Sequence, residues 1–217
     1  GKFGIPNLMR YVIGVNIVGI LISLVNPTFY YSYLSLDIAS ILHGQVWRIF
    51  TFVLSPSGQF GGTGMVSLLW FAIWIFVYYS IGTNLERMWG TFRFNVYIFG
   101  GLIFTVIGAF VAYGFLSMTG GLTIGIGYYV TTYYINMAIF LAFAVCFPDM
   151  QILLWFIIPV RMKWMAYVYA ALTIYDFVVS GAVGRISIVA ALLNFLIFYL
   201  STRNYQRVSP KEVHRKY

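Results

Sequence analysis

Long apolar runs alternate along the chain with short polar or glycine-rich segments, a pattern typical of a polytopic helical membrane protein. The first run ends at Asn26-Pro27, a pair that stops a helix. An aromatic connection follows at residues 28–62, and no spanning helix can include it. The six predicted helices cover residues 11–25, 65–81, 94–117, 128–147, 164–180 and 186–201.

These runs predict an all-α membrane protein with six transmembrane helices and a long aromatic first loop. Residues 1–201 should form a single membrane domain, and residues 202–217 a basic cytoplasmic tail. Several runs are shorter than the ~20 residues that cross a hydrocarbon core of about 30 Å. We therefore expect tilted helices or a locally thinner bilayer.

The composition of the chain also indicates that the protein lies in a lipid bilayer. The chain has 217 residues, of which 61% are hydrophobic and 8% charged, whereas about 25% of the residues in a soluble domain are charged. This excludes soluble enzymes, nucleic-acid-binding domains and disordered linkers. Two histidines and one cysteine also leave too few ligands for a zinc or iron–sulfur site, so we expect no metal and no cofactor.

The net charge of +8 is distributed so that it orients the helices. With a cytoplasmic N-terminus, 11 of the 13 basic residues fall in cytoplasmic segments, and only Arg48 and Arg185 remain outside. The positive-inside rule then places both termini in the cytoplasm. The same distribution argues against nucleic acid as a partner.

The predicted helices lack the groups needed for intramembrane proteolysis. His43 falls in the first loop and His214 in the tail, so no predicted helix contains a histidine. Asp176 is the one acidic residue clearly within a run, although an aspartyl mechanism needs two. Because the general base is missing, we expect no catalytic residues.

Three polar residues inside the predicted helices allow two interpretations. Buried membrane acids are costly and usually functional, so Asn136, Asp176 and Asn194 could serve a small transporter or channel. Alternatively, the asparagines bond neighbouring helices, and Asp176 meets Arg185 across the short fifth loop. We favour the second, structural interpretation.

Ordered motifs from about residue 36 to 200 resemble the rhomboid superfamily. Residues 43–51, His-Gly-Gln-Val-Trp-Arg-Ile-Phe-Thr, are similar to its first-loop signature Gly-Gln-x-Trp-Arg-x-x-Thr, and residues 147–164 resemble its fourth-to-fifth connection. Gly82, Glu86 and Gly90 resemble the family pattern that joins the second and third helices. Their spacing of four stacks them on one helix face, where glycine admits a close neighbour and glutamate can accept hydrogen bonds from helix-end amides. The predicted structural motif comprises Trp47, Arg48, Gly82, Glu86 and Gly90.

The catalytic part departs from the family pattern. Active rhomboids carry Gly-x-Ser-Gly at the start of the fourth helix and a histidine on the sixth. Here Tyr133 stands near the nucleophile position and Ser187 near the histidine position, while Trp70 and Trp74 replace the residues that assist the oxyanion site. The resemblance therefore implies a six-helix rhomboid pseudoprotease, similar to derlins.

The resemblance also implies a function and partners. We expect a non-proteolytic protein that binds transmembrane clients within the bilayer for recognition, escort, quality control or degradation. Its partners would be membrane-protein clients and lipids, with a membrane protease or degradation machinery as a further partner. A client groove is expected between the second and fifth helices, at Ser67, Trp74, Tyr167 and Phe177. The compact core favours a bacterial inner membrane over the endoplasmic reticulum.

Overall fold

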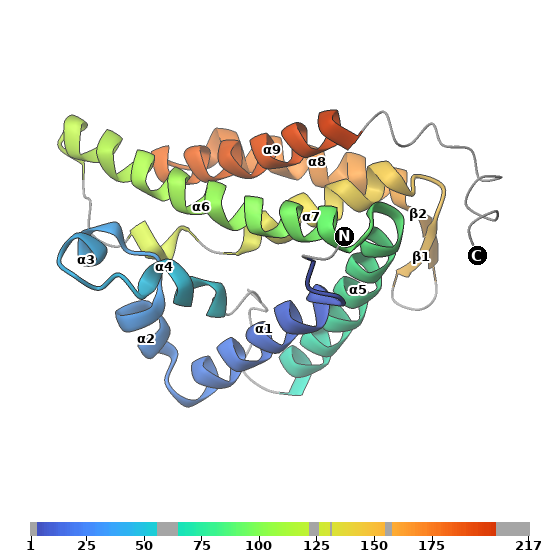
Figure 1. Cartoon of the computed structure of the whole chain (residues 1–217), viewed down its shortest axis with the longest axis horizontal. Coiled ribbons are helices and arrows are strands. Elements are labelled where there is room, and N and C mark those ends of the chain that lie inside the picture. Colours follow the sequence, from blue (N-terminus) through green and yellow to red (C-terminus); the bar gives the residue numbers. More distant parts are fainter. Residues whose placement is uncertain (1–3, 56–64, 122–125, 131, 155–157, 203–217) are drawn as a thin grey trace.

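Each of the six apolar runs forms a helix in the computed structural model of the chain (Figure 1). The structure describes residues 4–55, 65–121, 126–130, 132–154 and 158–202. Apart from one end, the helices begin and end within about five residues of the predicted runs. They are α1 (Leu8–Val25), α5 (Met65–Trp89), α6 (Thr91–Thr119), α7 (Tyr133–Cys146), α8 (Met162–Val179) and α9 (Ala182–Thr202).

The exception is the end of α5, which continues about two turns past its apolar stretch, through residues 83–87, all of which except Leu85 are polar. Gly90 then ends the helix with a φ of +82° and lets α6 start at the next residue. Gly120 ends α6 in the same way with a φ of +69°. Glycine suits both positions because a Cβ makes positive φ unfavourable.

Three helices in the described part of the chain are long and apolar enough to cross a membrane. They are Leu8–Val25, Thr91–Thr119 and Ala182–Leu200, and a shorter apolar stretch covers Ile135–Cys146. Many large apolar side chains on the outer faces of α1, α6, α8 and α9 are exposed, as expected of helices that face lipid. These features support a helical integral membrane protein, whereas the six-span topology stays a prediction.

The aromatic connection after α1 folds into short helical pieces. We call its described residues, 26–55, loop 1. The pieces are α2 (Pro27–Phe29), the π-helix η1 (Tyr30–Leu34), α3 (Ile38–Leu42), α4 (Arg48–Thr51) and the 3-10 helix η2 (Phe52–Leu54). Side-chain caps start two of them: Asn26 accepts from the Thr28 amide at 3.1 Å, and Asp37 from the Ser40 amide at 3.3 Å.

Two further elements lie in the later connections. The 3-10 helix η3 (Ile126–Tyr128) lies between α6 and α7. Between α7 and α8, β1 (Gln151–Leu154) and β2 (Ile158–Arg161) form an antiparallel hairpin in which Gln151 is opposite Arg161. Apart from this hairpin, the regular elements of the described chain are helical, as expected.

The helix α7 is the centre of the molecule. From residue 135 to 144 only Leu141 is partly exposed, and α7 packs against α5, α6, α8 and α9. Small residues bring α6 and α9 together on one side: a Cβ added to Gly108 would lie 3.1 Å from the Ala190 Cβ. Such close approach of helix backbones is the usual way in which membrane helices gain packing energy.

The basic connections lie at one end of the molecule. Figure 1 shows the start of α1, the turn between α5 and α6, the β1–β2 hairpin and the end of α9 at that end. Arg10, Arg87, Arg93, Arg161 and Lys163 belong to these segments. These basic residues therefore lie at the same end of the described molecule, as the positive-inside rule requires, and the cytoplasmic location of that end stays a prediction. The predicted tail lies outside the described residues from residue 203 onwards.

Candidate functional site

The first-loop motif is held by a row of backbone carbonyls at the end of η1. Arg48 donates from Nη2 to the Ser32 carbonyl and from Nη1 to the Ser35 carbonyl at 3.0 Å. Trp47 Nε1 donates to the Tyr33 carbonyl at 3.1 Å, and Thr51 Oγ1 to the Leu34 carbonyl at 3.1 Å. Four consecutive carbonyls, at residues 32–35, thus receive donors from three motif side chains.

Arg48 is 3% exposed, and its described partners are neutral. Besides the carbonyls, Nε donates to Gln45 Oε1 at 2.7 Å, and Nη1 approaches Ser35 Oγ at 3.4 Å. Buried charges need such partners because desolvation is expensive. The planar guanidinium can donate to several acceptors at once, so the motif closes loop 1 upon itself.

A buried tyrosine connects the two ends of this loop. Tyr30 is 0% exposed, and its hydroxyl donates to the Phe52 carbonyl at 3.1 Å. Burial raises the pKa of the Tyr30 phenol, so it stays a protonated donor at neutral pH. Loop 1 is therefore a fixed element of the fold, built around η1.

The second part of the motif joins the end of α5 to the start of α1. A Cβ added to Gly82 would lie 2.5 Å from Met9 Cγ, so only glycine leaves room for Met9. One turn later, Glu86 Oε1 accepts a hydrogen bond of 2.9 Å from the backbone amide of Asn7, the N-cap of α1. A carboxylate at a helix N-terminus also interacts favourably with the helix dipole.

Replacing Glu86 by alanine should lower the free energy of unfolding by about 1 kcal/mol, because it removes one charge-assisted but exposed hydrogen bond. For a chain of this size, that corresponds to a fall of about 2–4 °C in the thermal midpoint. Glu86→Gln keeps an acceptor oxygen and should lose less. A Glu86→Ala midpoint equal to that of the parent in the same detergent would contradict the capping role.

Three phenols gather near the nucleophile position that the resemblance suggested. We call Tyr78 of α5, Tyr133 of α7 and Tyr169 of α8 the phenol cluster. The Tyr169 hydroxyl lies within hydrogen-bonding reach of the other two. Tyr78 is 8% exposed and donates to the Asn136 carbonyl at 3.4 Å, whereas Tyr133 is 44% exposed. The cluster thus extends from the protein surface to the core.

Two of the other degenerate positions, Trp74 and Ser187, have ordinary structural contacts. Trp74 packs against Tyr78 with ring centroids 4.6 Å apart. Ser187 is buried and donates to the Val183 carbonyl one turn earlier in α9, at 2.9 Å. Trp70 lies in α5, but its side chain is outside the described part of the structure.

The four residues expected to line a client groove differ in their surroundings. Trp74 is half-buried against Tyr78, whereas Tyr167 and Phe177 are 67% and 40% exposed on α8. The side chain of Ser67 in α5 lies outside the described residues. Both α5 and α8 pack against α7, and the contact between Tyr78 and Tyr169 connects α5 with α8. That contact joins the two helices that were expected to form the groove.

The three polar residues of the predicted membrane helices lie in different surroundings. Asn194 donates to the Tyr97 carbonyl at 3.3 Å and lies against Gly100 and Gly101, so it ties α9 to α6. Asn136 is buried in the first turn of α7. Asp176 is partly buried in the last turn of α8.

Arg185 does not make the contact with Asp176 that we expected. It donates instead to the Phe177 and Val178 carbonyls, at 3.0 and 2.9 Å. The unbonded carbonyls at the end of α8 attract a cation there. The guanidinium therefore caps the helix next to Asp176.

No group of three or more His, Cys, Asp or Glu side chains within the described residues could hold a metal ion. The expectation that the protein uses no cofactor stays a prediction. The sequence pattern singled out Tyr133, whereas Tyr78 and Tyr169 were not among the predicted site residues. In a chain with 18 tyrosines, no signal in the spacing distinguishes these two.

Comparison with known proteins identifies the family. The family model described as "Eukaryotic integral membrane protein (DUF1751)" matches residues 10–215. No curated protein and no solved structure matches the chain. A eukaryotic family overturns the expected bacterial inner membrane: a compact helical core fits membranes that differ in thickness by only a few ångströms, so it does not discriminate between them. Since the match covers almost the whole chain, the protein belongs to this family of eukaryotic integral membrane proteins.

Proposed function

We propose that this chain is a non-proteolytic, rhomboid-like membrane protein that binds the transmembrane segments of other membrane proteins. The observation that carries the proposal is the phenol cluster of Tyr78, Tyr133 and Tyr169. Tyr133 stands near the position at which the resemblance to rhomboids suggests the nucleophile, and the cluster offers hydrogen bonds in place of a nucleophile and base.

The shortage of bases supports the non-enzymatic part of the proposal. A serine nucleophile needs an adjacent general base. Of the two histidines in the sequence, His43 lies in loop 1, and His214 belongs to the predicted tail, outside the described residues. Ser187, near the expected histidine position, is bonded within its own helix. A phenol without a base beside it remains a hydrogen-bonding group.

The binding part of the proposal rests on the surface of α8. Trp164, Tyr167 and Tyr175 are each at least 60% exposed on this helix. Tyr133 of α7 is also exposed, and it contacts Tyr169 of α8. Lipid tails are as apolar as leucine, so a client gains little from hydrophobic contact alone. A client that is polar or loosely helical gains hydrogen bonds that lipid cannot supply.

A photo-crosslinking amino acid at Tyr167 or Trp74, introduced in native membranes, tests this proposal. We expect adducts to other membrane proteins from these sites and few from Val18 or Leu21, which are exposed on α1. With the crosslinker at Tyr167, Tyr133→Phe should reduce the adducts about fivefold, the factor supplied by one hydrogen bond worth about 1 kcal/mol. Tyr113→Phe on α6 is the matched control and should leave them unchanged.

Two results would contradict the proposal. Equal crosslinking from α1 and α8 would mean that no client site exists on this face. Specific labelling of one serine by a fluorophosphonate probe, lost when that serine is replaced by alanine, would show that the protein is an enzyme after all.

A further inference from the structure

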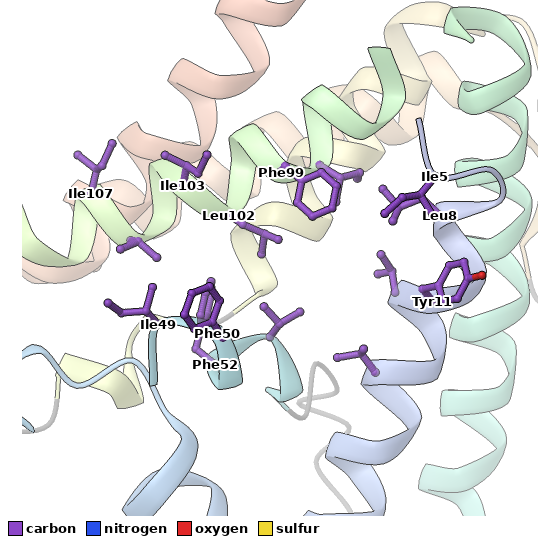
Figure 2. Close-up of a pocket in the computed structure, with 15 residues that line it drawn as sticks. Ile5, Leu8, Tyr11, Ile49, Phe50, Phe52, Phe99, Leu102, Ile103 and Ile107 are labelled. Atoms are coloured by element: carbon purple, nitrogen blue, oxygen red, sulfur yellow. The ribbon is translucent and has the colours of Figure 1, made fainter. Parts of the chain in front are cut away.

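A large apolar groove lies between α1, loop 1 and α6, and no residue of the phenol cluster lines it. Its volume is 810 Å³, within the range of about 300–1,000 Å³ typical of small-molecule sites. Fifteen residues line it, and Tyr11 is the one among them with a polar side-chain atom. Figure 2 shows Ile49, Phe50 and Phe52 of loop 1 on one side of the open space, and Leu102 of α6 pointing toward them from the other.

The groove has the length of one membrane leaflet. Its lining on α6 runs from Ile98 to Ile107, which is about 14 Å at 1.5 Å per residue. Half of a hydrocarbon core is about 15 Å thick. Because α1 and α6 are both candidate membrane spans, we expect the groove to lie at hydrocarbon depth.

Water and a protein partner are poor occupants of this space. Water needs two to four polar partners to fill a cavity, and the lining supplies at most one hydroxyl, which points away from the space in Figure 2. A stable protein interface buries about 800 Å² on each partner, and the concave lining is much smaller than that. The lining also carries no charge that could attract a polar ligand.

We propose that the groove binds an acyl chain of a membrane lipid, lying lengthwise between α1, loop 1 and α6. The residues at its rim are accessible to such a chain, since Tyr11, Phe50 and Ile103 are 62%, 79% and 58% exposed. Val46 and Trp47 are also exposed on loop 1, so we expect loop 1 to contact lipid beside the groove. The site is separate from the phenol cluster and does not depend on client binding.

Packing explains why an acyl chain would prefer the groove to the surrounding bulk lipid. A chain that leaves bulk lipid gains no hydrophobic free energy, but it gains dispersion contacts on three sides, which flexible neighbouring lipids supply less completely. Leu8, Phe52 and Ile98 are almost fully buried at the base of the groove and give it a defined shape. Each of the three comes from a different wall.

The full chain, reconstituted in phosphatidylcholine vesicles with a trace of phosphatidylcholine bearing an acyl-chain diazirine, provides the test. After irradiation, mass spectrometry maps the crosslinked residues. We expect Val12, Val53 and Leu102 to exceed Leu196 and Ile197, which are exposed on α9, by about tenfold, equal to a preference of about 1.4 kcal/mol.

A filling variant makes the test specific. Leu102→Trp should occupy the groove and abolish this excess, while Leu193→Trp on the exposed face of α9 should not. If Leu102→Trp does not fold, Val106→Phe serves the same purpose, and the distribution in the parent chain remains decisive. Equal labelling of groove and α9, or an excess that persists in a folded filling variant, would overturn the proposal. So would protein–protein adducts from a photo-crosslinker at Leu102, which would indicate a protein occupant.

Discussion

Replacement of Arg48 by alanine is expected to lower the free energy of unfolding by about 3–5 kcal/mol. The guanidinium is 3% exposed and serves the carbonyls of Ser32 and Ser35 together with Gln45 Oε1. The variant would leave these acceptors without a donor, in a part of the molecule that water cannot easily reach. Since 1 kcal/mol corresponds to about 2–4 °C for a chain of this size, the thermal midpoint in detergent should fall by about 10 °C.

Two further substitutions distinguish the effect of the Arg48 hydrogen bonds from the effect of losing a positive charge. Arg48→Lys keeps the charge but cannot reach several acceptors in one plane, so it should recover only part of the loss. Arg87→Ala removes an exposed arginine, and substitutions at such positions usually change stability by less than about 0.5 kcal/mol. A melting point of Arg48→Ala that matches that of Arg87→Ala would show that the carbonyl row does not hold loop 1.

The second large effect is expected at Gly19 in α1, where Gly19→Ala should cost about 3 kcal/mol through overpacking. The added Cβ would overlap the carbonyl oxygen of Leu54 and lie 2.8 Å from its carbonyl carbon. Backbone atoms cannot rotate away as a side chain can, so α1 and η2 would have to separate. Thermal unfolding in detergent measures the loss.

Gly14 on the same helix is the matched control, because a Cβ there meets nothing within 4 Å. Gly14→Ala should be neutral or stabilising by up to about 1 kcal/mol, the difference in helix propensity between the two residues. Opposite signs at Gly14 and Gly19 would establish the close contact between α1 and loop 1. A similar shift in both variants would show that general effects on α1 decide the outcome.

Both predictions concern the element on which the proposed acyl-chain groove depends. Arg48 holds loop 1 together, and Gly19 sets its distance from α1. Phe52 and Val53, which follow the motif directly, form one wall of the groove. The first-loop motif therefore has a structural role that is independent of any catalytic or client-binding site.

Much of the local structure follows from the sequence. The apolar runs predicted the six helices because a segment in lipid must satisfy its own backbone bonds, and helices do so within one segment. Gly82 and Glu86 were expected to admit a close neighbour and to accept bonds from helix-end amides, and they contact Met9 and the Asn7 amide. The family match supports the membrane environment that composition predicted. Composition could not indicate which membrane, since apolar helices suit them all.

The sequence by itself therefore determined the solvent, the helices and the residue types of the first-loop motif, because these depend on periodicity and composition within one segment. The tertiary structure alone decided the partners. Arg48 meets carbonyls 13 and 16 residues away, and Tyr78 and Tyr169 meet across two helices. The apolar groove exists because α1, loop 1 and α6 leave space between them. A period of 3.6 residues shows which face of a helix is apolar, but the path of the whole chain sets which helix, lipid or client that face meets.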